Sequence, residues 1–412
     1  MINTDNELSN LIHNIALDGF SKEGGYSFEE NKIFSRIKNL GSELWIDSGD
    51  RDRASALWKK ELSALTTNNT LANQVVQTGI MDDEIRNAVQ KIKEKAPAIS
   101  EDGLVFEVGF VINCKIALRL VKEFDVKVSI ELHPALSRDK ERTIAYAKRY
   151  YKICPENFIV KIPLTPEGYL AVRELRKEGI PINFTLGFSA RQNYLAAHLS
   201  NPDYVNIFLG RLNAVVSDNA MGDGNYVGEA VAIASQKAID ELKRVNPAIN
   251  TRQIAASIRN WQQVITLSGI DVQTIPPKAV EDLLSSDADL STVESCKYRE
   301  LEIGIERPYL ERFNLLWQVD TRFKQFVDRL LKEDIDNLTG DDLIAICKGN
   351  DIDLFYRFTD SDLNSIKEHG KIPKLGRWNE NIALDDLMTV SALQSFAKDQ
   401  EELDNRIKGM VR

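Results

Sequence analysis

A single lysine interrupts the apolar run from Phe158 to Ile162, and this residue, Lys161, is the first candidate for chemistry in the sequence. The run has the length and composition of a buried strand. The next residues start a helix, with Thr165 as N-cap, Pro166 at the first helical position and Glu167 in the first turn. Lys161 is therefore predicted near the carboxyl end of a strand. Burial favours the neutral form of an amine, and a neutral amine can attack a carbonyl carbon to form a Schiff base.

An isolated strand lysine also has a structural explanation, in which its stem is buried and its ammonium reaches water. Polar residues near the carboxyl ends of other predicted strands favour the chemical interpretation. They are Asp47, Thr66, Asn68, Glu131, Asn183, Thr185 and Asn206. Each of them alone is explained by capping a helix, satisfying a turn or facing solvent. Together they predict one common site.

Eight short strand-like segments alternate with helical patterns along the chain. We predict strands at residues 43–48, 64–68, 126–131, 158–162, 181–186, 204–209, 253–257 and 272–275. Eight strands, each followed by a helix, indicate an α/β fold of the (β/α)8 TIM barrel type, with additional N- and C-terminal helices. An open doubly wound sheet is the alternative, but Ser48-Gly49-Asp50 does not resemble the glycine-rich first turn of such a sheet. Barrel enzymes place their chemistry at the carboxyl ends of the strands.

The predicted domain organisation has three parts. Residues 1–40 form an N-terminal helical segment, residues 41–284 the barrel, and residues 285–412 a helical C-terminal elaboration that ends in a helix packed on the barrel. Apolar residues at helical spacing predict helices over 319–331 and 384–410. After the sixth strand we expect a helix-like segment, a loop at Gly222-Asp223-Gly224 and a long helix that ends near Arg244.

The amino-acid composition argues against several classes of binding partner and cofactor. The net charge of −10 argues against nucleic acid and anionic membrane surfaces, so an anionic substrate needs a local cluster of arginines. The four cysteines show no CxxC spacing and the four histidines no HExxH spacing, so we expect no metal site, no disulfide framework and no cofactor. Met1 to Leu17 is polar and acidic, so we expect neither a signal peptide nor a membrane span, and a cytoplasmic location.

Seven short motifs resemble those of transaldolases, which are barrel-fold class I aldolases that work through a Schiff base. The motifs are Ile-Asp-Ser-Gly-Asp at 46–50, Thr-Thr-Asn at 66–68, Val-Ser-Ile-Glu at 128–131, Val-Lys-Ile-Pro at 160–163, Ile-Asn-Phe-Thr-Leu at 182–186, Gly-Arg at 210–211 and Ala-Ser-Ile-Arg at 256–259. The similarity covers about residues 40–283 and resumes in the last helix, around residues 396–403. It implies transfer of a three-carbon dihydroxyacetone unit from a ketose phosphate to an aldose phosphate, as in the pentose phosphate pathway. The implied partners are small sugar phosphates, and a homodimer is an assembly that the resemblance allows.

The resemblance also implies a role for each matching residue. Lys161 would form the Schiff base, Glu131 would act as general acid and base through a water held by Thr185, and Asp47 would move the proton of the hydroxyl next to the breaking bond. The implied substrate-binding residues are Thr66, Asn68, Asn183, Asn206, Phe208, Arg211, Ser257 and Arg259, with Arg211, Ser257 and Arg259 on the phosphate. These residue types suit the chemistry, because a protonated imine stores the carbanion as an enamine and arginines bind phosphate in a bidentate way.

The sequence departs from the family pattern in three places. These departures affect which sugars are expected to bind, and they leave the Schiff-base chemistry of the lysine intact. Asn69 stands where proline is usual, Asn206 stands where serine is usual, and the stretch 285–380 is longer than in compact members. Phe208 favours transfer, because a tyrosine there is typical of members that release the unit to water. The alternatives are an aldolase acting on fructose 6-phosphate or an unusual sugar phosphate, and a non-catalytic sugar-phosphate sensor. A sensor would be expected to lack the lysine or an acid, and this sequence keeps both.

Overall fold

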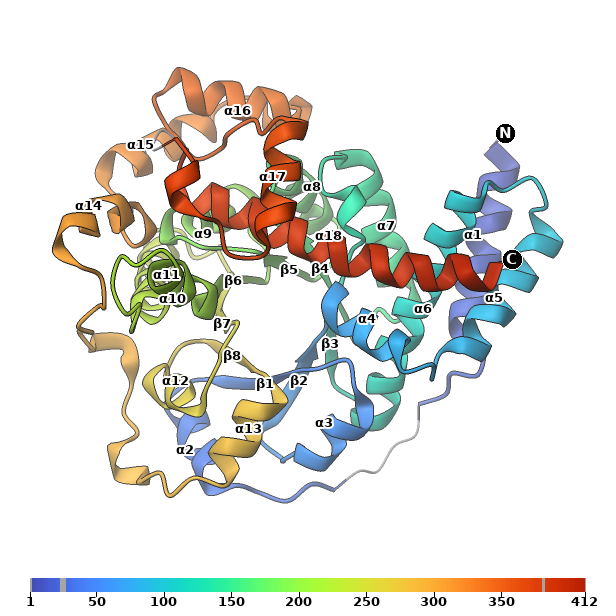
Figure 1. Cartoon of the computed structure of the whole chain (residues 1–412), viewed down its shortest axis with the longest axis horizontal. Coiled ribbons are helices and arrows are strands. Elements are labelled where there is room, and N and C mark those ends of the chain that lie inside the picture. Colours follow the sequence, from blue (N-terminus) through green and yellow to red (C-terminus); the bar gives the residue numbers. More distant parts are fainter. Residues whose placement is uncertain (1, 23–26, 380–381, 412) are drawn as a thin grey trace.

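Eight parallel strands close into a barrel in the computed structural model, which describes residues 2–22, 27–379 and 382–411 (Figure 1). The strands pair in chain order, and β1 completes the barrel by pairing with β8. Their bounds are β1 (Glu43–Asp47), β2 (Leu62–Thr66), β3 (Lys127–Glu131), β4 (Phe158–Pro163), β5 (Ile182–Thr185), β6 (Tyr204–Phe208), β7 (Arg252–Ala256) and β8 (Val272–Ile275). The predicted fold class and the eight predicted strands are confirmed.

Helices surround the barrel and connect its strands. Two of them precede β1, and the others follow in chain order: α1 (Ile2–Leu17), α2 (Lys32–Asn39), α3 (Arg51–Leu57), α4 (Asn69–Gln77), α5 (Asp82–Lys95), α6 (Glu101–Phe124), α7 (Lys140–Ile153), α8 (Pro166–Lys177), α9 (Ala190–Leu195), α10 (Leu209–Asp218), α11 (Val227–Val245), α12 (Trp261–Thr266) and α13 (Pro277–Leu284). No helix of the described residues is long and apolar enough to cross a membrane.

The start of α8 explains how the chain leaves β4. Thr165 is the N-cap, and its Oγ1 accepts a hydrogen bond from the main-chain N of Gly168 at 3.0 Å, as the sequence predicts. A Cβ on Gly168 would lie 2.3 Å from the carbonyl oxygen of Pro163, so only glycine permits this close return of the helix to the strand. The turn is thereby fixed directly after the strand that carries Lys161.

Several predicted strand boundaries are wrong by one or two residues, and two of them bear on the site. Strand β2 ends at Thr66, and Asn68 is instead the N-cap of α4, because its side chain satisfies the helix rather than the sheet. Strand β7 ends at Ala256, because Ser257 has a left-handed backbone with φ +61° that no strand residue adopts. The helix-like segment, the loop and the long helix expected after β6 are confirmed as α10, a loop that contains Gly222 and Gly224, and α11.

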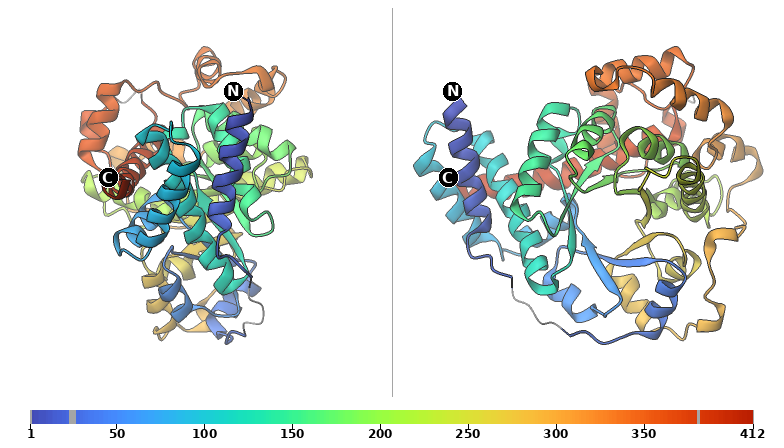
Figure 2. Two further views of the ribbon diagram at one scale, coloured as in Figure 1. Left: turned by 90° about the vertical axis from the view of Figure 1, so that its right-hand side faces the viewer. Right: turned by 180° about the vertical axis from the view of Figure 1, so that it is seen from behind.

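The C-terminal region adds five helices, of which the last is the longest. They are α14 (Leu310–Phe313), α15 (Thr321–Leu330), α16 (Gly340–Gly349), α17 (Asp360–His369) and α18 (Leu384–Val411). Helices α14 to α17 lie to one side of the barrel, and α18 crosses above the strands towards α1, α5 and α6 (Figures 1 and 2). The two predicted C-terminal helices are confirmed. The three-part domain division stays a prediction.

Helix α18 is attached to loops at the carboxyl ends of the strands. Asn69, two residues beyond the motif threonine Thr67, donates from Nδ2 to Oε1 of Gln400 at 2.9 Å. Thr389 Oγ1 donates to the carbonyl oxygen of Leu186, which directly follows β5, at 2.9 Å. These contacts place α18 over the end of the barrel where Lys161 lies.

Candidate active site

Three inward-facing residues form a row across neighbouring strands. Glu131 on β3 pairs in register with Lys161 on β4, and Lys161 pairs with Asn183 on β5. Residues paired in register on adjacent strands project from the same face of the sheet. The row therefore faces the barrel interior near the carboxyl ends of the strands, as the sequence predicts for a catalytic site.

The ammonium group of Lys161 is buried and has two oxygen neighbours. Its Nζ lies 3.1 Å from Oε2 of Glu131 and donates to the main-chain oxygen of Thr67 at 3.2 Å. The side chains of Lys161 and Glu131 are only 4% and 3% exposed. Because both groups are removed from solvent, each charge offsets part of the desolvation cost of the other. Transfer of one proton along this contact would leave a neutral amine and a neutral carboxylic acid.

Two buried acids have raised pKa values. Burial raises the pKa of Glu131, and the positive charge of Lys161 opposes that rise. Burial likewise raises the pKa of Asp47, opposed by the charge of Lys161 and by a hydrogen bond from Thr66. Thr66 Oγ1 donates to Oδ1 of Asp47 at 2.6 Å and lies 2.5 Å from Oγ1 of Thr274. A carboxyl group whose pKa is moved towards neutrality suits proton transfer in both directions.

A chain of amides and hydroxyls lies beside the lysine. Asn206 Nδ2 donates to Oγ1 of Thr185 at 2.9 Å and to Oδ1 of Asn183 at 3.3 Å. Asn183 Nδ2 in turn donates to Oγ of Ser129 at 3.0 Å. Because the Thr185 oxygen accepts from Asn206, its own hydrogen is left for another acceptor. Thr185 can therefore hold a water in the role that the resemblance implies.

Two arginines, Arg211 and Arg259, add positive charge to the site. Arg211 in the first turn of α10 is 6% exposed, and its Nη1 has no hydrogen-bond partner among the described residues. Burial and the charge of Arg259 lower the pKa of Arg211 to about 10. A Cβ on Gly210 would lie 2.8 Å from Cγ of Arg259 and 2.3 Å from the oxygen of Ser257, so glycine is needed here for the two segments to meet. A buried guanidinium without a partner indicates a place for an anion.

One cavity of about 640 Å³ collects most of the predicted side chains. Its lining includes Asp47, Thr66, Asn68, Lys161, Asn183, Asn206, Phe208, Arg211, Ser257 and Arg259. Glu131 and Thr185 do not line it, but lie directly behind it, against Lys161 and Asn206. The structure therefore brings the predicted residues together, while their roles stay predictions.

Asn68 reaches the cavity from a helix N-terminus rather than from a strand. Its Oδ1 accepts a hydrogen bond from the main-chain N of Leu71 at 2.8 Å. The NH₂ group is then the part of the amide available to a ligand hydroxyl.

Sequence reasoning missed three residues of the cavity region. Thr274 on β8 forms the second contact of Thr66, and its signal is a hydroxyl residue near the carboxyl end of a strand, Val-Gln-Thr-Ile. Lys371 and Asp399 enter from the C-terminal region and line the same cavity. No local pattern distinguishes these two residues from the other charged residues around them, because long-range packing alone brings them to the site.

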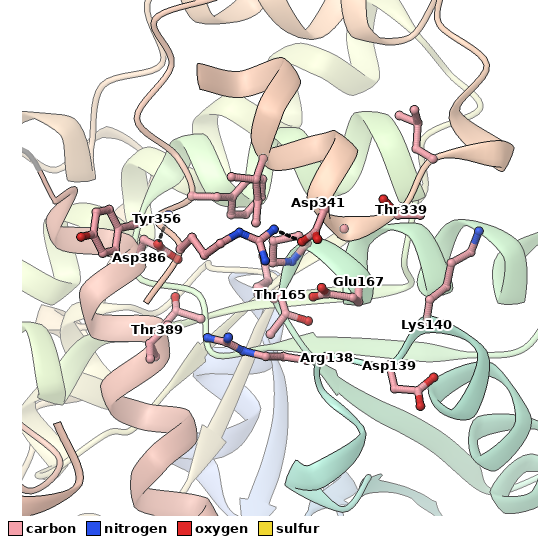
Figure 3. Close-up of a pocket in the computed structure, with 18 of the residues that line it drawn as sticks. Arg138, Asp139, Lys140, Thr165, Glu167, Thr339, Asp341, Tyr356, Asp386 and Thr389 are labelled. Atoms are coloured by element: carbon pink, nitrogen blue, oxygen red, sulfur yellow. Dashed lines mark hydrogen bonds and ion pairs between the residues drawn. The ribbon is translucent and has the colours of Figure 1, made fainter. Parts of the chain in front are cut away.

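A second cavity of about 720 Å³ lies away from the lysine (Figure 3). It is bounded by the starts of α7 and α8, by α16 and by α18, and none of the predicted site residues lines it. Arg357 pairs with Asp341 across it, and Asp386 accepts the main-chain N–H of Tyr356 at 2.6 Å. Burial raises the pKa of Asp386 to about 8. The larger cavity thus lacks the lysine and the arginine pair that define the smaller one.

No cluster that could hold a metal ion occurs among the residues that the structure describes. Such a cluster would be a group of three or more His, Cys, Asp and Glu side chains. The four cysteines are buried and free.

Comparison with known proteins adds an independent observation. The family described as transaldolase/fructose-6-phosphate aldolase matches residues 44–341. A transaldolase of Shewanella baltica (strain OS195) is 28% identical over 258 residues, which cover 61% of this chain and 79% of that protein. A probable transaldolase of Aquifex aeolicus is 31% identical over 246 residues, with 59% and 91% covered. A transaldolase of Kluyveromyces lactis is 30% identical over 271 residues, with 62% and 77% covered. The matched range contains all eight strands and the cavity residues from Asp47 to Arg259.

Proposed function

This chain belongs to the transaldolase/fructose-6-phosphate aldolase family, and from that premise we propose that it transfers a dihydroxyacetone unit from a ketose phosphate to an aldose phosphate through a Schiff base on Lys161. The observation that carries the proposal is the buried contact of 3.1 Å between Lys161 Nζ and Glu131 Oε2. It places an amine beside an acid in a cavity that also holds Asp47 and two arginines. A reaction of this type fits the pentose phosphate pathway in the cytoplasm.

Covalent attachment begins with proton transfer from Lys161. Glu131 takes up the proton, either directly or through a water on Thr185, and the neutral amine attacks the ketose carbonyl. The resulting carbinolamine loses water when Glu131 returns the proton to the departing hydroxyl. The raised pKa of Glu131 supports both directions of this exchange.

Carbon–carbon cleavage requires a base at the hydroxyl next to the bond that breaks. Asp47 faces the cavity, and its pKa is raised by burial, so it is suited to accept that proton. The bonding electrons move into the protonated imine and form an enamine, and the aldose phosphate leaves. A second aldose phosphate then takes up the enamine carbon, and Asp47 returns the proton to the new hydroxyl.

Phosphate recognition falls to Arg211, Arg259 and Ser257. Arg211 has a buried Nη1 without a partner, which a phosphate oxygen would satisfy. The left-handed backbone of Ser257, φ +61°, is a strained conformation of the kind found at ligand sites. In a chain with a net charge of −10, such local contacts replace the attraction that bulk charge does not supply.

Transfer of the dihydroxyacetone unit to an aldose phosphate requires that no nearby proton donor protonates the enamine first. Protonation would lead to release of free dihydroxyacetone. Phe208 lines the cavity on β6 and has no hydroxyl to order a water or pass a proton. The side chain of Phe396 on α18 lies near it, with ring centroids 6.4 Å apart. This apolar wall supports the transferase over the aldolase that releases dihydroxyacetone.

The decisive experiment is reductive trapping with borohydride, read by intact mass. Wild-type protein with fructose 6-phosphate and borohydride should gain the mass of the donor fragment, and Lys161→Met should not. Lys115→Met is a matched control, because Lys115 is also buried, 6% exposed, and paired with Glu84 at 3.1 Å. Both variants need an unchanged circular dichroism spectrum. An adduct of equal yield in Lys161→Met would overturn the assignment of the lysine.

A further inference from the structure

Lys371 lines the same cavity as Arg211 and Arg259, although it comes from the segment between α17 and α18. Its side chain forms no hydrogen bond or ion pair with any other described residue. Lys367, four residues earlier, also lines the cavity, but its Nζ is paired with Glu401 at 2.7 Å. Lys371 is an exposed residue, and it adds a positive charge without a hydrogen-bonded partner to a cavity that already holds two arginines.

The segment that carries Lys371 is held in place by the helix that carries Arg211. Asn219 caps the end of α10, and its Nδ2 donates to the carbonyl oxygen of Pro373 at 3.0 Å. Its Oδ1 accepts from the main-chain N of Leu375 at 2.8 Å. These two bonds fix the backbone just beyond Lys371 to the same helix whose first turn bears Arg211.

The three cations oppose one another. Burial lowers the pKa of Lys371, and the charges of Arg211 and Arg259 lower it further. Asp399 offsets part of this repulsion, but its carboxylate also accepts a hydrogen bond from Thr70 Oγ1. Like charges gathered at a cavity wall destabilise the unliganded protein, and a bound dianion removes that cost. The arrangement therefore suits a phosphate group.

We propose that Lys371 is a third cationic contact for the substrate phosphate, together with Arg211 and Arg259. A phosphate monoester has three terminal oxygens, so it can accept hydrogen bonds from two guanidinium groups and from the ammonium group of a lysine. The C-terminal elaboration then takes part in substrate recognition instead of only covering the barrel. This inference rests on the proposed function, because it takes the bound phosphate group to be that of a sugar phosphate substrate.

The test compares Lys371→Met with Lys374→Met. Lys374 lies in the same loop, but its Nζ approaches the carbonyl oxygen of Asp218 at 3.5 Å and does not line the cavity. Titration with inorganic phosphate should give a dissociation constant about tenfold weaker for Lys371→Met, the loss typical of one charge-assisted contact. Lys374→Met should bind like wild type, and Lys371→Arg should keep most of the affinity. In Lys371→Met, the KM for a ketose phosphate should rise by a factor similar to that of the phosphate dissociation constant, while kcat should change little.

The outcomes separate this inference from the proposed function. Phosphate affinity of Lys371→Met within about twofold of wild type would overturn the contact, and so would an equal loss in Lys374→Met, which would indicate a general charge effect. Failure of the wild type to form a borohydride adduct would overturn the Schiff-base function. The titration with inorganic phosphate would still decide the role of Lys371 in that case.

Discussion

Glu131 and Lys161 face each other across adjacent strands, with Oε2 3.1 Å from Nζ and both side chains almost fully buried. A charged lysine is stable there only with a partner, yet the reaction needs the lysine neutral. One proton moved along the contact meets both requirements, because the pair stays neutral overall before and after the transfer. In the proposed function, the acid would be both the stabilising partner of the resting lysine and the base that activates it.

Glu131→Gln should slow formation of the trapped adduct by about 10²- to 10⁴-fold, because the amide cannot take up the proton of Lys161. The measurement is a time course of borohydride trapping by intact mass. Glu107→Gln is the control, because Glu107 is another buried acid, paired with Arg149 at 2.5 Å outside the cavity. An unchanged rate in Glu131→Gln would assign proton transfer to a different group.

Arg211→Ala and Arg259→Ala should each weaken binding of sugar phosphates by about 1.5–3 kcal/mol, with the larger loss at the more buried Arg211. Steady-state KM values for glyceraldehyde 3-phosphate and for glyceraldehyde as acceptors measure the effect. The unphosphorylated acceptor should lose far less. Arg252→Ala is the control, because Arg252 pairs with Glu43 at the amino end of β7, at 2.6 Å. Equal losses for both acceptors would mean that the arginines support the barrel rim rather than the phosphate.

Phe208→Tyr should increase release of free dihydroxyacetone from a ketose phosphate in the absence of acceptor. The new hydroxyl would bring a proton source to the enamine at a wall that is now aromatic and apolar. A coupled assay for dihydroxyacetone, with and without erythrose 4-phosphate, checks this. Rapid release by the wild type without acceptor would favour the aldolase, while the role of Lys161 would stand.

Asp386→Asn should stabilise the protein at pH 8 and have little effect near pH 4. Burial raises the pKa of Asp386 to about 8, so the folded state holds the proton where the unfolded state has lost it. Stability therefore falls as the pH rises from about 4 to about 8, and the neutral amide avoids this loss, on the order of 5 kcal/mol. Urea unfolding of both proteins at several pH values measures it. A parallel pH dependence in wild type and variant would contradict the raised pKa.

Local sequence signals were sufficient for the barrel and for most of its site. Lys161 could be placed because an apolar run and an N-cap at Thr165 bracket it, and both features act over a few residues. Asn68 was placed on the wrong element, because a short polar residue after a strand satisfies a turn or caps a helix equally well until the helix is seen. The roles of these residues came from a resemblance, and the geometry is compatible with them.

Lys371 could not be predicted. Its position at the cavity depends on Asn219 binding the segment that follows it, a contact between residues more than 150 positions apart. Side chains that approach through such distant contacts leave no periodic pattern in the sequence. Residues after β8 could be predicted as helices but not as a part of the site.

The hydrogen bond between Asn69 and Gln400 joins residues 331 positions apart, and it has a consequence for the order of synthesis. A ribosome would have made every strand of the barrel before it reached Leu384, the first residue of α18. Until α18 emerges, Phe396 does not lie over Arg211, and the lysine pocket stays open to water. All eight strands would thus be available before the helix that completes the pocket, and in the proposed function α18 would be the last element to be added to the site.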